Sequence, residues 1–373
     1  MKIVHISTRI KIDYGGGEKF LEQFIASFNN YEHVFIGRDN VVNKLFEKAG
    51  YKSFYSPAGF EPITPKRKLF IPISFILGIV QFIKFYKFWR DADVIIVSAS
   101  SIAEPIFLLP WIKIFFPKKR LIQFIHGMCI SYYYKQPLVG LLRKVWTTME
   151  IVFVSESQKL SWENNNLVGK KNYVVYNGVK ISNKPLVVRA DEIVRIGYIG
   201  RMYFEKKVDI LLKALSLVKP EKKVEVYLAG DGPQLKELKQ LEQSLNVSKN
   251  ISFKWLGFVD DTKEFYSMLD LVVFPSAIES FGLVLLEAWE RGVPVITSNI
   301  PAFIELKLEA PSLERKLAFE LNNISDLRDK IDYFLNNTKL YTESNYKDSL
   351  HSFVKYNFSF ETMFNEYNKL LKS

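Results

Sequence analysis

Two carboxylates, Glu279 and Glu287, are separated by seven residues at a point where the sequence could bind a charged ligand. A buried strand is predicted before them and a helix over Leu283–Arg291. The backbone N–H groups of Phe281–Leu283 would then lie at the helix start and favour an anion, and Gly282 leaves room for close approach. Glu287 follows about 7–8 Å further along the helix axis. This spacing suits a diphosphate at the helix start and a ribose diol beside Glu287, as in a nucleotide sugar.

Two cations follow another predicted strand, Val194–Ile199, after the turn residue Gly200. Arg201 offers a planar fork for two phosphate oxygens, and Lys206 offers a compact point charge. Solvated surface cations are common, but this pair stands beside a glycine turn at the end of a strand. Together the two side chains could neutralise the charge that builds up on a departing diphosphate.

The first half contains a glycine run at a strand–helix junction, with Gly15 and Gly16 followed by Gly17 and Glu18. Glycines at such a junction allow a backbone to approach a phosphate, although a glycine run alone is more often a turn. The run does not match GxGxxG, and no acidic residue ends a second strand in the dinucleotide manner. A nicotinamide cofactor is therefore disfavoured.

His126 directly follows the buried strand predicted over Leu121–Ile125. A histidine at the carboxyl end of a strand is well placed for chemistry, although a single histidine is about as often structural. Ser155, after the next strand, predicts a helix N-cap.

Short β-branched runs alternate with longer amphipathic segments, which predicts parallel α/β domains. In the first half the predicted strands are Lys2–Ser7, His33–Gly37, Val94–Val97, Leu121–Ile125, Ile151–Val154 and Tyr173–Tyr176. In the second half they are Val194–Ile199, Val224–Ala229, Ile251–Trp255, Leu271–Phe274 and Val293–Thr297. Ligands of open parallel sheets bind beyond the strands' carboxyl ends, which is where the motifs above fall.

Length and charge narrow the classes of function. A chain of 373 residues predicts about two domains, and 48% hydrophobic with 24% charged residues is typical of a globular protein. The single cysteine excludes an internal disulfide and fits a reducing compartment. Residues 1–180 carry 25 Lys/Arg and 13 Asp/Glu, a net +12, whereas residues 181–373 carry 26 and 27, a net −1. The basic first half indicates an anionic surface or substrate.

The motifs together resemble those of retaining GT-B glycosyltransferases of the large family 4 group. Residues 274–296, from Phe274 to Ile296, are similar to the family's donor-site signature, and the glycine run is similar to its GGxE motif. The family's GR…EKG pattern is matched at Gly200, Arg201, Glu205 and Lys206. Lys207 departs from it, because the family usually has glycine there, so we expect a slightly different helix start. The similarity weakens after Pro294.

The resemblance implies an α/β fold of the GT-B type, with two facing Rossmann-like doubly wound domains. It implies an acceptor-binding domain over 1–180 and a donor-binding domain over 181–355. A C-terminal helix over 356–373 would return to the first domain.

The resemblance also implies a role for each motif residue. Arg201, Lys206 and the amides of Phe281, Gly282 and Leu283 would bind the diphosphate, and Glu287 the ribose. Glu279 and His126 would contact the transferred sugar, while Gly15 and Gly16 shape the loop near the donor. His126, Glu279, Arg201 and Lys206 are the predicted catalytic residues. We expect no metal and no cofactor besides the nucleotide diphosphate sugar as co-substrate.

Two apolar stretches of the first half, residues 69–83 and 106–116, are flanked by basic residues. They are too short to span a bilayer, which takes about 20 residues. We expect burial in the core to account for most of their surface. Burial does not explain the charge, so we also expect the first domain to rest on an anionic membrane at the cytoplasmic face. A lipid-linked saccharide of a cell-surface polysaccharide or glycolipid would be its acceptor.

Three other functions stay open. A nucleotide-sugar epimerase shares this architecture and would interconvert sugars without an acceptor. A soluble glucan or disaccharide synthase of the same fold is possible, although the basic, aromatic first domain argues mildly against it. The positive charge could mark a nucleic-acid-binding protein, but no RNA- or DNA-binding module is recognisable, and we expect no nucleic-acid partner.

Overall fold

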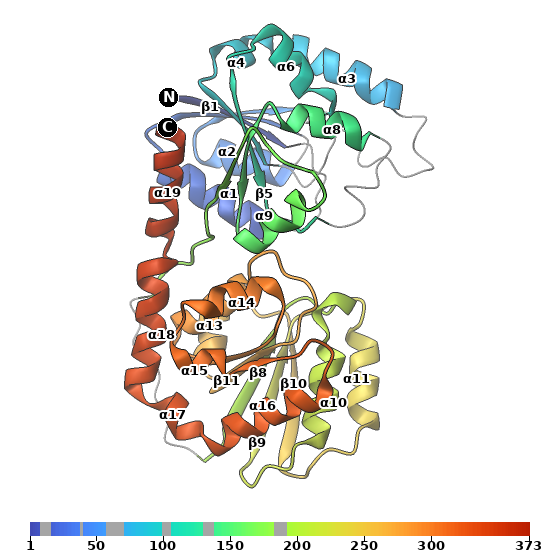
Figure 1. Cartoon of the computed structure of the whole chain (residues 1–373), viewed down its shortest axis with the longest axis vertical. Helices are drawn as coiled ribbons and strands as arrows, with labels where there is room; N and C mark the ends of the chain where they lie inside the picture. The colour runs from blue at the N-terminus through green and yellow to red at the C-terminus, as the bar shows by residue number, and fades with distance from the viewer. Residues whose placement is uncertain (8–15, 38–39, 57–70, 99–105, 130–137, 183–191) are drawn as a thin grey trace. The chain divides into compact units, whose positions relative to one another are not determined.

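The computed structural model describes residues 1–7, 16–37, 40–56, 71–98, 106–129, 138–182 and 192–373. The chain forms two compact units, Met1–Val175 and Tyr176–Ser373 (Figure 1). Each unit is an α/β body with its own parallel sheet, and the two are described separately below.

The first unit is built on a seven-stranded sheet in the order β3-β2-β1-β4-β5-β6-β7. All pairings between its described strands are parallel. Apolar runs such as Ile3–Val4 and Ile95–Val97 are fully buried, as expected for strands covered on both faces. The strands are β1 (Lys2–Ser7), β2 (Glu32–Gly37), β3 (Lys52–Tyr55), β4 (Val94–Ser98), β5 (Arg120–Ile125), β6 (Glu150–Phe153) and β7 (Lys171–Val174).

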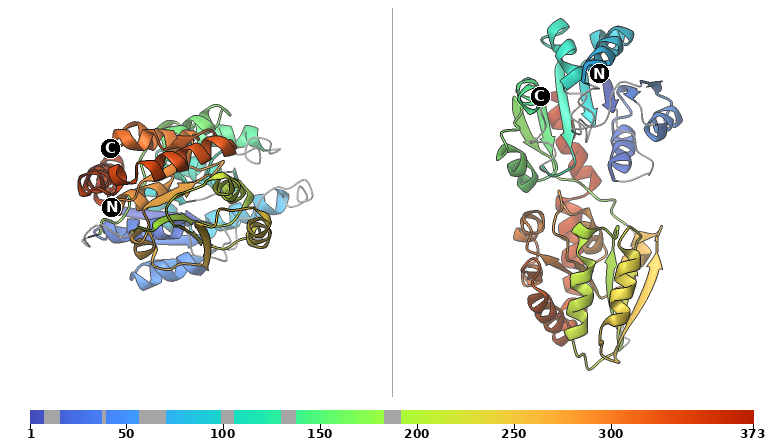
Figure 2. Two further views of the ribbon diagram at one scale, coloured as in Figure 1. Left: turned by 90° about the horizontal axis from the view of Figure 1, so that it is seen from below. Right: turned by 90° about the vertical axis from the view of Figure 1, so that its right-hand side faces the viewer.

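Helices cover both faces of this sheet (Figure 2). The described helices are α1 (Gly16–Ser27), α2 (Asn40–Lys48), α3 (Ile71–Lys84), α4 (Tyr86–Asp91), α6 (Leu109–Phe115), α8 (Val139–Trp146) and α9 (Glu156–Glu163). Ser155 caps α9 as predicted, because its side chain accepts a hydrogen bond from the Gln158 N–H at 3.0 Å.

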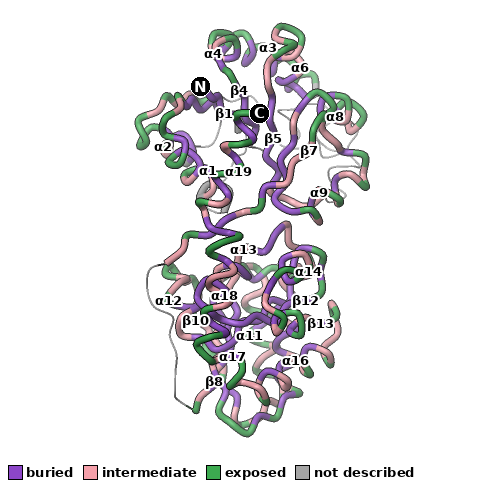
Figure 3. The backbone as a smooth tube through the Cα atoms, turned by 60° about the vertical axis from the view of Figure 1, so that its left-hand side comes forward, coloured by how far each residue is buried: buried purple, intermediate pink, exposed green. Residues whose placement is uncertain are grey.

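The second unit has a six-stranded sheet in the order β10-β9-β8-β11-β12-β13, with parallel pairing throughout. Its strands are β8 (Val194–Ile199), β9 (Val224–Ala229), β10 (Ile251–Gly257), β11 (Leu271–Phe274), β12 (Val295–Ser298) and β13 (Ala318–Phe319). Figure 3 shows that the strands lie in the buried interior and the helices alternate between buried and exposed residues.

The helices of the second unit follow the strands in alternation and then form a C-terminal series. They are η2 (Phe204–Lys206), α10 (Val208–Leu217), α11 (Leu235–Ser244), α12 (Thr262–Ser267), α13 (Leu283–Glu290), α14 (Pro301–Leu308), α15 (Ser312–Arg315), α16 (Ile324–Asn336), α17 (Thr338–Thr342), α18 (Ser344–Asn357) and α19 (Phe360–Lys372). Val179 pairs with the α18–α19 junction, since its N–H donates to Phe358 and its carbonyl accepts from Phe360. That α19 returns to the first domain stays a prediction.

Both sheets reverse their strand order once, between β1 and β4 in the first unit and between β8 and β11 in the second. Ligands of open α/β sheets bind at such a reversal, beyond the carboxyl ends of the two strands. In the second unit the loops after β8 and β11 carry Arg201, Lys206 and Glu279. In the first unit the loop after β1, with Gly15, lies outside the described residues.

All eleven predicted strands are present, with ends that differ by at most two residues. Two strands were not predicted, β3 and β13. β3 is half exposed and reads Lys-Ser-Phe-Tyr, and β13 has only two residues, so neither has the apolar run of a buried strand.

The expected burial of residues 69–83 is wrong for α3. Its outer side carries most of the apolar side chains, and its inner side carries Ser74, Gly78 and Gln81. Small and polar residues face inward because the α3 backbone at Gly78 lies very close to the backbone of Phe107. A Cβ on Gly78 would lie 2.1 Å from the carbonyl oxygen of Phe107.

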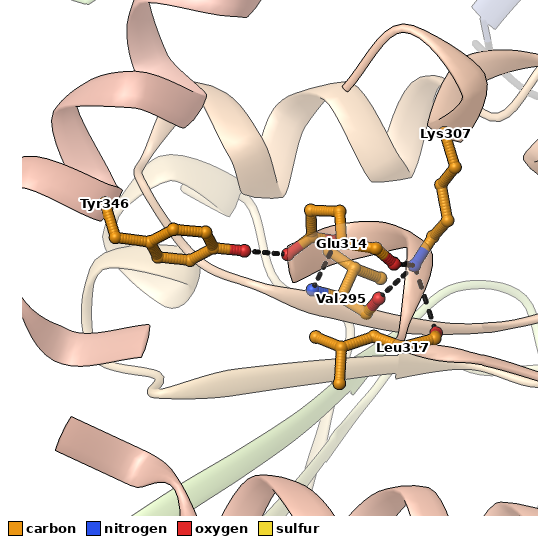
Figure 4. Close-up of polar contacts among 5 residues, drawn as sticks. All are labelled: Val295, Lys307, Glu314, Leu317 and Tyr346. Carbon is orange, nitrogen blue, oxygen red and sulfur yellow. Dashed lines mark hydrogen bonds and ion pairs between the residues drawn. The ribbon is translucent and has the colours of Figure 1, made fainter. Parts of the chain in front are cut away.

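A buried ionic cluster joins the last strands of the second unit to its helices (Figure 4). The ammonium of Lys307 donates to the carbonyls of Val295 (2.6 Å), Glu314 (2.9 Å) and Leu317 (3.0 Å), and lies 3.5 Å from the Glu314 carboxylate. That carboxylate also accepts from the Tyr346 hydroxyl and from the Val295 N–H. Burial lowers the pKa of Lys307 to about 8. Because each charge has several partners, the cluster holds β12, α14, α15 and α18 in one arrangement.

Candidate functional site

Lys206 and Glu279, 73 residues apart in the sequence, form an ion pair in the second unit. The Nζ atom of Lys206 lies 2.6 Å from Oε1 of Glu279, and both side chains are about four-fifths buried. Lys206 ends the single turn η2 after β8, and Glu279 stands in the loop after β11. The structure therefore brings together two predicted site residues at the point where the strand order reverses.

Backbone contacts fix the two loops to each other. The Ala277 N–H donates to the carbonyl of Glu205 at 2.8 Å, which ties the loop after β11 to η2. The Tyr198 hydroxyl donates to the carbonyl of Arg201 at 3.2 Å. Burial raises the pKa of Tyr198, so the hydroxyl stays protonated and keeps donating. The site is thus held in place before any ligand binds.

Glycines beside the Arg201 loop allow three loops to pack closely. Gly230 has φ +125°, and a Cβ there would lie 1.9 Å from the carbonyl oxygen of Gly200. The Met202 N–H donates to the carbonyl of Asp231 at 2.8 Å, and the Gly230 N–H donates to that of Gly257 at 2.6 Å. The loops after β8 and β9 and the end of β10 therefore support one another, and the Ala229–Pro233 turn has a structural role.

Lys207 occupies the position where the resembling family usually has glycine. Its backbone is left-handed, with φ 54° and ψ 35°, which a glycine would adopt without strain. Its ammonium lies over the Phe204 ring, 3.8 Å from the centroid. Helix α10 begins at Val208, directly after this residue in the conformation that glycine favours.

The start of α13 is shaped by Gly282, which has φ +108°. A Cβ at this residue would lie 2.9 Å from the ring of Phe303 on α14, so only glycine fits without movement. Phe281 is buried and stacks on Tyr176 with ring centroids 5.7 Å apart. Leu283 is the first residue of the helix, so the predicted anion-binding amides stand at its N-terminus.

Glu287 lies on the second turn of α13, and its Oε2 accepts a hydrogen bond from Tyr266 at 3.2 Å. Burial and the nearby Glu287 carboxylate raise the pKa of Tyr266. Sequence reasoning missed Tyr266, which stands 21 residues before Glu287 on α12. It orients the carboxylate that we expect to bind a ribose.

Arg201 is exposed, and its guanidinium lies 5.1 Å from the centroid of the Tyr203 ring. The stacked, exposed guanidinium is placed beside the end of β8, on the same loop as Lys206. Arg201, Lys206 and the start of α13 thus all follow the carboxyl ends of β8 and β11 in the chain.

His126 follows β5 in the first unit, half-buried, with its ring 5.0 Å from that of Phe20 on α1. The next peptide is anchored from α9, because the Gly127 carbonyl accepts from Gln158 and from the Trp162 indole, both at 2.9 Å. These two anchors were not predicted. Gly16 begins α1, whereas Gly15 lies outside the described residues.

Within the described parts of the chain, no group of three His, Cys, Asp or Glu side chains has a metal-binding arrangement. Among the same residues, no helix has the length and apolar character needed to cross a membrane.

The second unit is typical of a nucleotide-binding α/β domain, with cations and a helix N-terminus beyond the carboxyl ends of parallel strands. Residues 184–348 match the family described as "Glycosyl transferases group 1". The expected family resemblance is confirmed over this part of the chain, which is similar to the group 1 glycosyltransferases.

Two curated relatives match part of the chain. It is 33% identical over 173 residues to the O-antigen biosynthesis glycosyltransferase WclY of Escherichia coli. The matched segment covers 44% of this chain and 46% of WclY. It is 29% identical over 198 residues to the poly(ribitol-phosphate) alpha-N-acetylglucosaminyltransferase of Staphylococcus aureus, 52% of this chain and 38% of that protein. The chain therefore spans less than half the length of either relative.

Solved structures match the whole chain. The crystal structure of Anabaena Alr3699/HepE in complex with UDP has a TM-score of 0.78 at 19% identity, covering all of both chains. This likeness concerns the fold. The predicted α/β fold of the GT-B type is confirmed, with parallel sheets of seven and six strands.

Proposed function

We propose that the protein is a glycosyltransferase that moves a sugar from a nucleotide diphosphate sugar to a saccharide acceptor. The observation that carries this proposal is the Lys206–Glu279 pair, 2.6 Å apart, beside the loop that leads into α13. A cation, a carboxylate and a helix N-terminus together suit a ligand that has both a diphosphate and hydroxyl groups.

The pair also indicates what changes when the donor binds. In the free protein the Lys206 ammonium forms an ion pair with the Glu279 carboxylate. A diphosphate carries more negative charge than a carboxylate, so it would replace Glu279 as the partner of Lys206, with Arg201 as its second cation. Glu279 would then be released to accept hydrogen bonds from the sugar hydroxyls. Glu287, oriented by Tyr266, would bind the ribose, and His126 would contact the transferred sugar.

We propose that the transfer retains the anomeric configuration and needs no metal ion. The bond between the anomeric carbon and the phosphate oxygen breaks on the face where the acceptor oxygen bonds. The acceptor's proton passes to the leaving phosphate. Arg201, Lys206 and the α13 amides would stabilise the negative charge on the departing diphosphate. The "alpha" in the name of the Staphylococcus aureus relative supports an α-linked product.

We propose a lipid-linked saccharide as the acceptor, in the synthesis of a cell-surface polysaccharide or glycolipid at the cytoplasmic face of the membrane. The O-antigen relative supports the polymer class. The charge supports an anionic surface, because residues 1–175 carry 24 Lys/Arg and 13 Asp/Glu, whereas residues 176–373 carry 27 of each. A single cysteine, Cys129, fits a reducing compartment. Burial raises the pKa of its thiol to about 11, which disfavours the reactive thiolate.

A thermal-shift panel of UDP, GDP, ADP and their sugars tests the donor. UDP comes first because the similar Alr3699/HepE structure contains it. We expect one nucleotide to raise the melting temperature, with a tenfold or larger loss of affinity in Glu287→Ala. Lys213→Ala, which removes a surface ion pair with Asp209 on α10, is the matched control and should bind normally. If no nucleotide stabilises the protein at millimolar concentration, the proposal is wrong.

Incubation of the donor without an acceptor separates transfer from epimerisation. A transferase releases nucleotide slowly until an acceptor is added, whereas an epimerase interconverts the sugars on its own. The anomeric configuration of the product, read by NMR, then tests retention. The same assay with EDTA tests the metal requirement.

A further inference from the structure

Helix α3 has its polar side turned inward. Ser74, Gly78 and Gln81, which recur at helical spacing, are all buried, with Ser74 6% and Gln81 3% exposed. In a surface helix the buried stripe is normally the apolar one. Helices in lipid show the reverse distribution, with small and polar residues at the helix contact and apolar residues outside.

The outer surface formed by α3, the start of α4 and the end of α6, here called the α3–α6 face, is apolar. Its large side chains are between 41% and 66% exposed: Ile73, Phe75, Ile76, Val80, Ile83, Tyr86, Ile114 and Phe115. Figures 1 and 3 show α3 and α6 neighbouring each other with many exposed positions. An apolar patch of this kind on a water-soluble surface marks an interaction site.

Ring contacts join the two helices into one surface. Phe75 meets Trp111 with ring centroids 5.4 Å apart, and Phe82 meets Phe115 at 5.0 Å. Tyr86 meets Phe116 at 5.3 Å. The C-terminal end of α3 therefore lies against that of α6, and the residues that follow both helices stand close together.

Exposed cations stand at this shared end. Lys84 and Lys87 lie at the end of α3 and on α4, and Lys118 follows α6. Residues 71–120 carry seven Lys/Arg and three Asp/Glu, a net +4. This is more than a third of the +11 carried by residues 1–175. Charge and apolar surface are thus concentrated in the same part of the first unit.

We propose that the α3–α6 face docks on a membrane rich in anionic lipid. The apolar side chains would enter the headgroup boundary, and Lys84, Lys87 and Lys118 would contact lipid phosphates. At 14 residues α3 is about 21 Å long, shorter than the ~30 Å hydrocarbon core, so it would lie along the surface. This inference deepens the proposed lipid-linked acceptor by naming the surface that reaches the lipid.

A second copy of the chain fits this face less well. In a symmetric dimer the same patch occurs on both partners, so each cluster of lysines would approach its equivalent. Like charges at such an interface repel. An anionic lipid surface instead complements both properties of the face.

Vesicle flotation of the full chain tests the proposal. The vesicles contain phosphatidylcholine with 30% phosphatidylglycerol, and a second set contains phosphatidylcholine alone. We expect the wild type to partition at least tenfold more strongly onto the anionic set, with the difference falling at high salt. Ile76→Asp/Ile83→Asp should lose at least tenfold in partitioning. Leu160→Asp, on α9 and 53% exposed, is the control and should change it less than twofold.

A fluorescent label on a single introduced cysteine tests whether the α3–α6 face contacts the membrane without adding a charge to it. Val80→Cys and, as its control, Leu160→Cys are each made in a Cys129→Ser background and labelled with an environment-sensitive dye. The dye at position 80 should shift to the blue on anionic vesicles, and the dye at position 160 should not. Equal shifts at both positions, or equal flotation of the double aspartate variant and the wild type, would overturn the proposal.

Two further measurements keep the outcomes separate. Light scattering of the wild type and the double variant in solution detects a dimer, and a dimer lost in the variant without vesicle binding would overturn the membrane proposal. Nucleotide thermal shifts on the same variants should be unchanged. If the protein binds nucleotides but not vesicles, the proposed docking surface is wrong and the proposed donor site stands. If it binds vesicles but not nucleotides, the proposed activity is wrong and the docking surface stands.

Discussion

The two units bury charge and expose apolar surface in different ways. The second unit encloses a paired ammonium and carboxylate, Lys307 and Glu314, and holds the loops after β8 and β11 with backbone hydrogen bonds. The first unit encloses an uncharged histidine pair, His5 and His33, and leaves apolar side chains of α3 and α6 exposed. The second unit therefore holds its buried groups in one fixed arrangement. The first has the surface expected where a protein adapts to a partner.

Breaking the ionic cluster tests the rigidity of the second unit. We expect Lys307→Met to lower its unfolding free energy by about 3–5 kcal/mol, because Glu314 would keep a buried charge without its cation. Hydrogen exchange in β11 and β12 measures the change. The double variant Lys307→Met/Glu314→Gln should recover part of the loss, and the exposed Lys339→Met should cost under ~0.5 kcal/mol. A loss spread equally over both units would contradict the comparison.

Removing the site ammonium separates chemistry from stability within the second unit. We expect Lys206→Ala to lower kcat about 100-fold, because the departing diphosphate loses a cation. The loss of stability should be smaller than for Lys307→Met, because the Glu279 side chain is 17% exposed and water can solvate its carboxylate, whereas that of Glu314 is fully buried. Steady-state kinetics with the donor found in the thermal-shift panel measures this. Full activity in the variant would remove Lys206 from the mechanism.

Acid should weaken the first unit before the second. His5 and His33 share a hydrogen bond of 2.9 Å, and burial lowers the pKa of both. Below pH ~6.5 the unfolded histidines bind protons that the folded pair excludes, so stability falls as the pH falls. We expect a loss of about 1–2 kcal/mol between pH 7 and 5.5.

Hydrogen exchange in β1 and β2, compared with β8 and β9 at both pH values, measures this loss. His5→Leu should flatten the pH dependence in the first unit. His351, on α18, is the control, and His351→Leu should leave that dependence as it is. An equal acid response in β8 and β9 would assign the effect to other groups.

The smallest effect is expected at the loop between β8 and α10. Lys207→Gly should stabilise the second unit by ~0.5–1 kcal/mol, since glycine removes the left-handed strain at φ 54°, partly offset by its chain entropy. Urea unfolding measures the gain. Lys219→Gly, at an exposed position without a positive φ, is the control and should not stabilise.

Sequence reasoning predicted what depends on neighbouring residues. Buried strands such as Lys2–Ser7 and Val224–Ala229 have the predicted ends, because short segments rich in β-branched residues and bounded by polar or turn residues favour strands. The Lys206–Glu279 contact was also within reach, since the carboxyl ends of β8 and β11 meet at one edge of a parallel sheet. The roles of the site residues stay predictions.

The features missed depend on distant residues. Tyr266 and Glu287 meet across two helices, and Gln158 and Trp162 reach back to a loop about 30 residues earlier. The inward side of α3 could not be chosen from its sequence, because apolar residues surround a narrow polar stripe. The choice follows from the close approach of Gly78 to Phe107.

The enclosed ammonium of Lys307 has a consequence for chemical labelling. The folded protein shields this amine from acylating reagents, and once exposed the amine regains the ordinary lysine pKa of about 10.4 and reacts like a surface lysine. Its side chain is only 4% exposed, so a reagent reaches it only when the surrounding helices separate. The acylation rate of this single lysine, read by mass spectrometry, therefore reports how often that part of the protein opens.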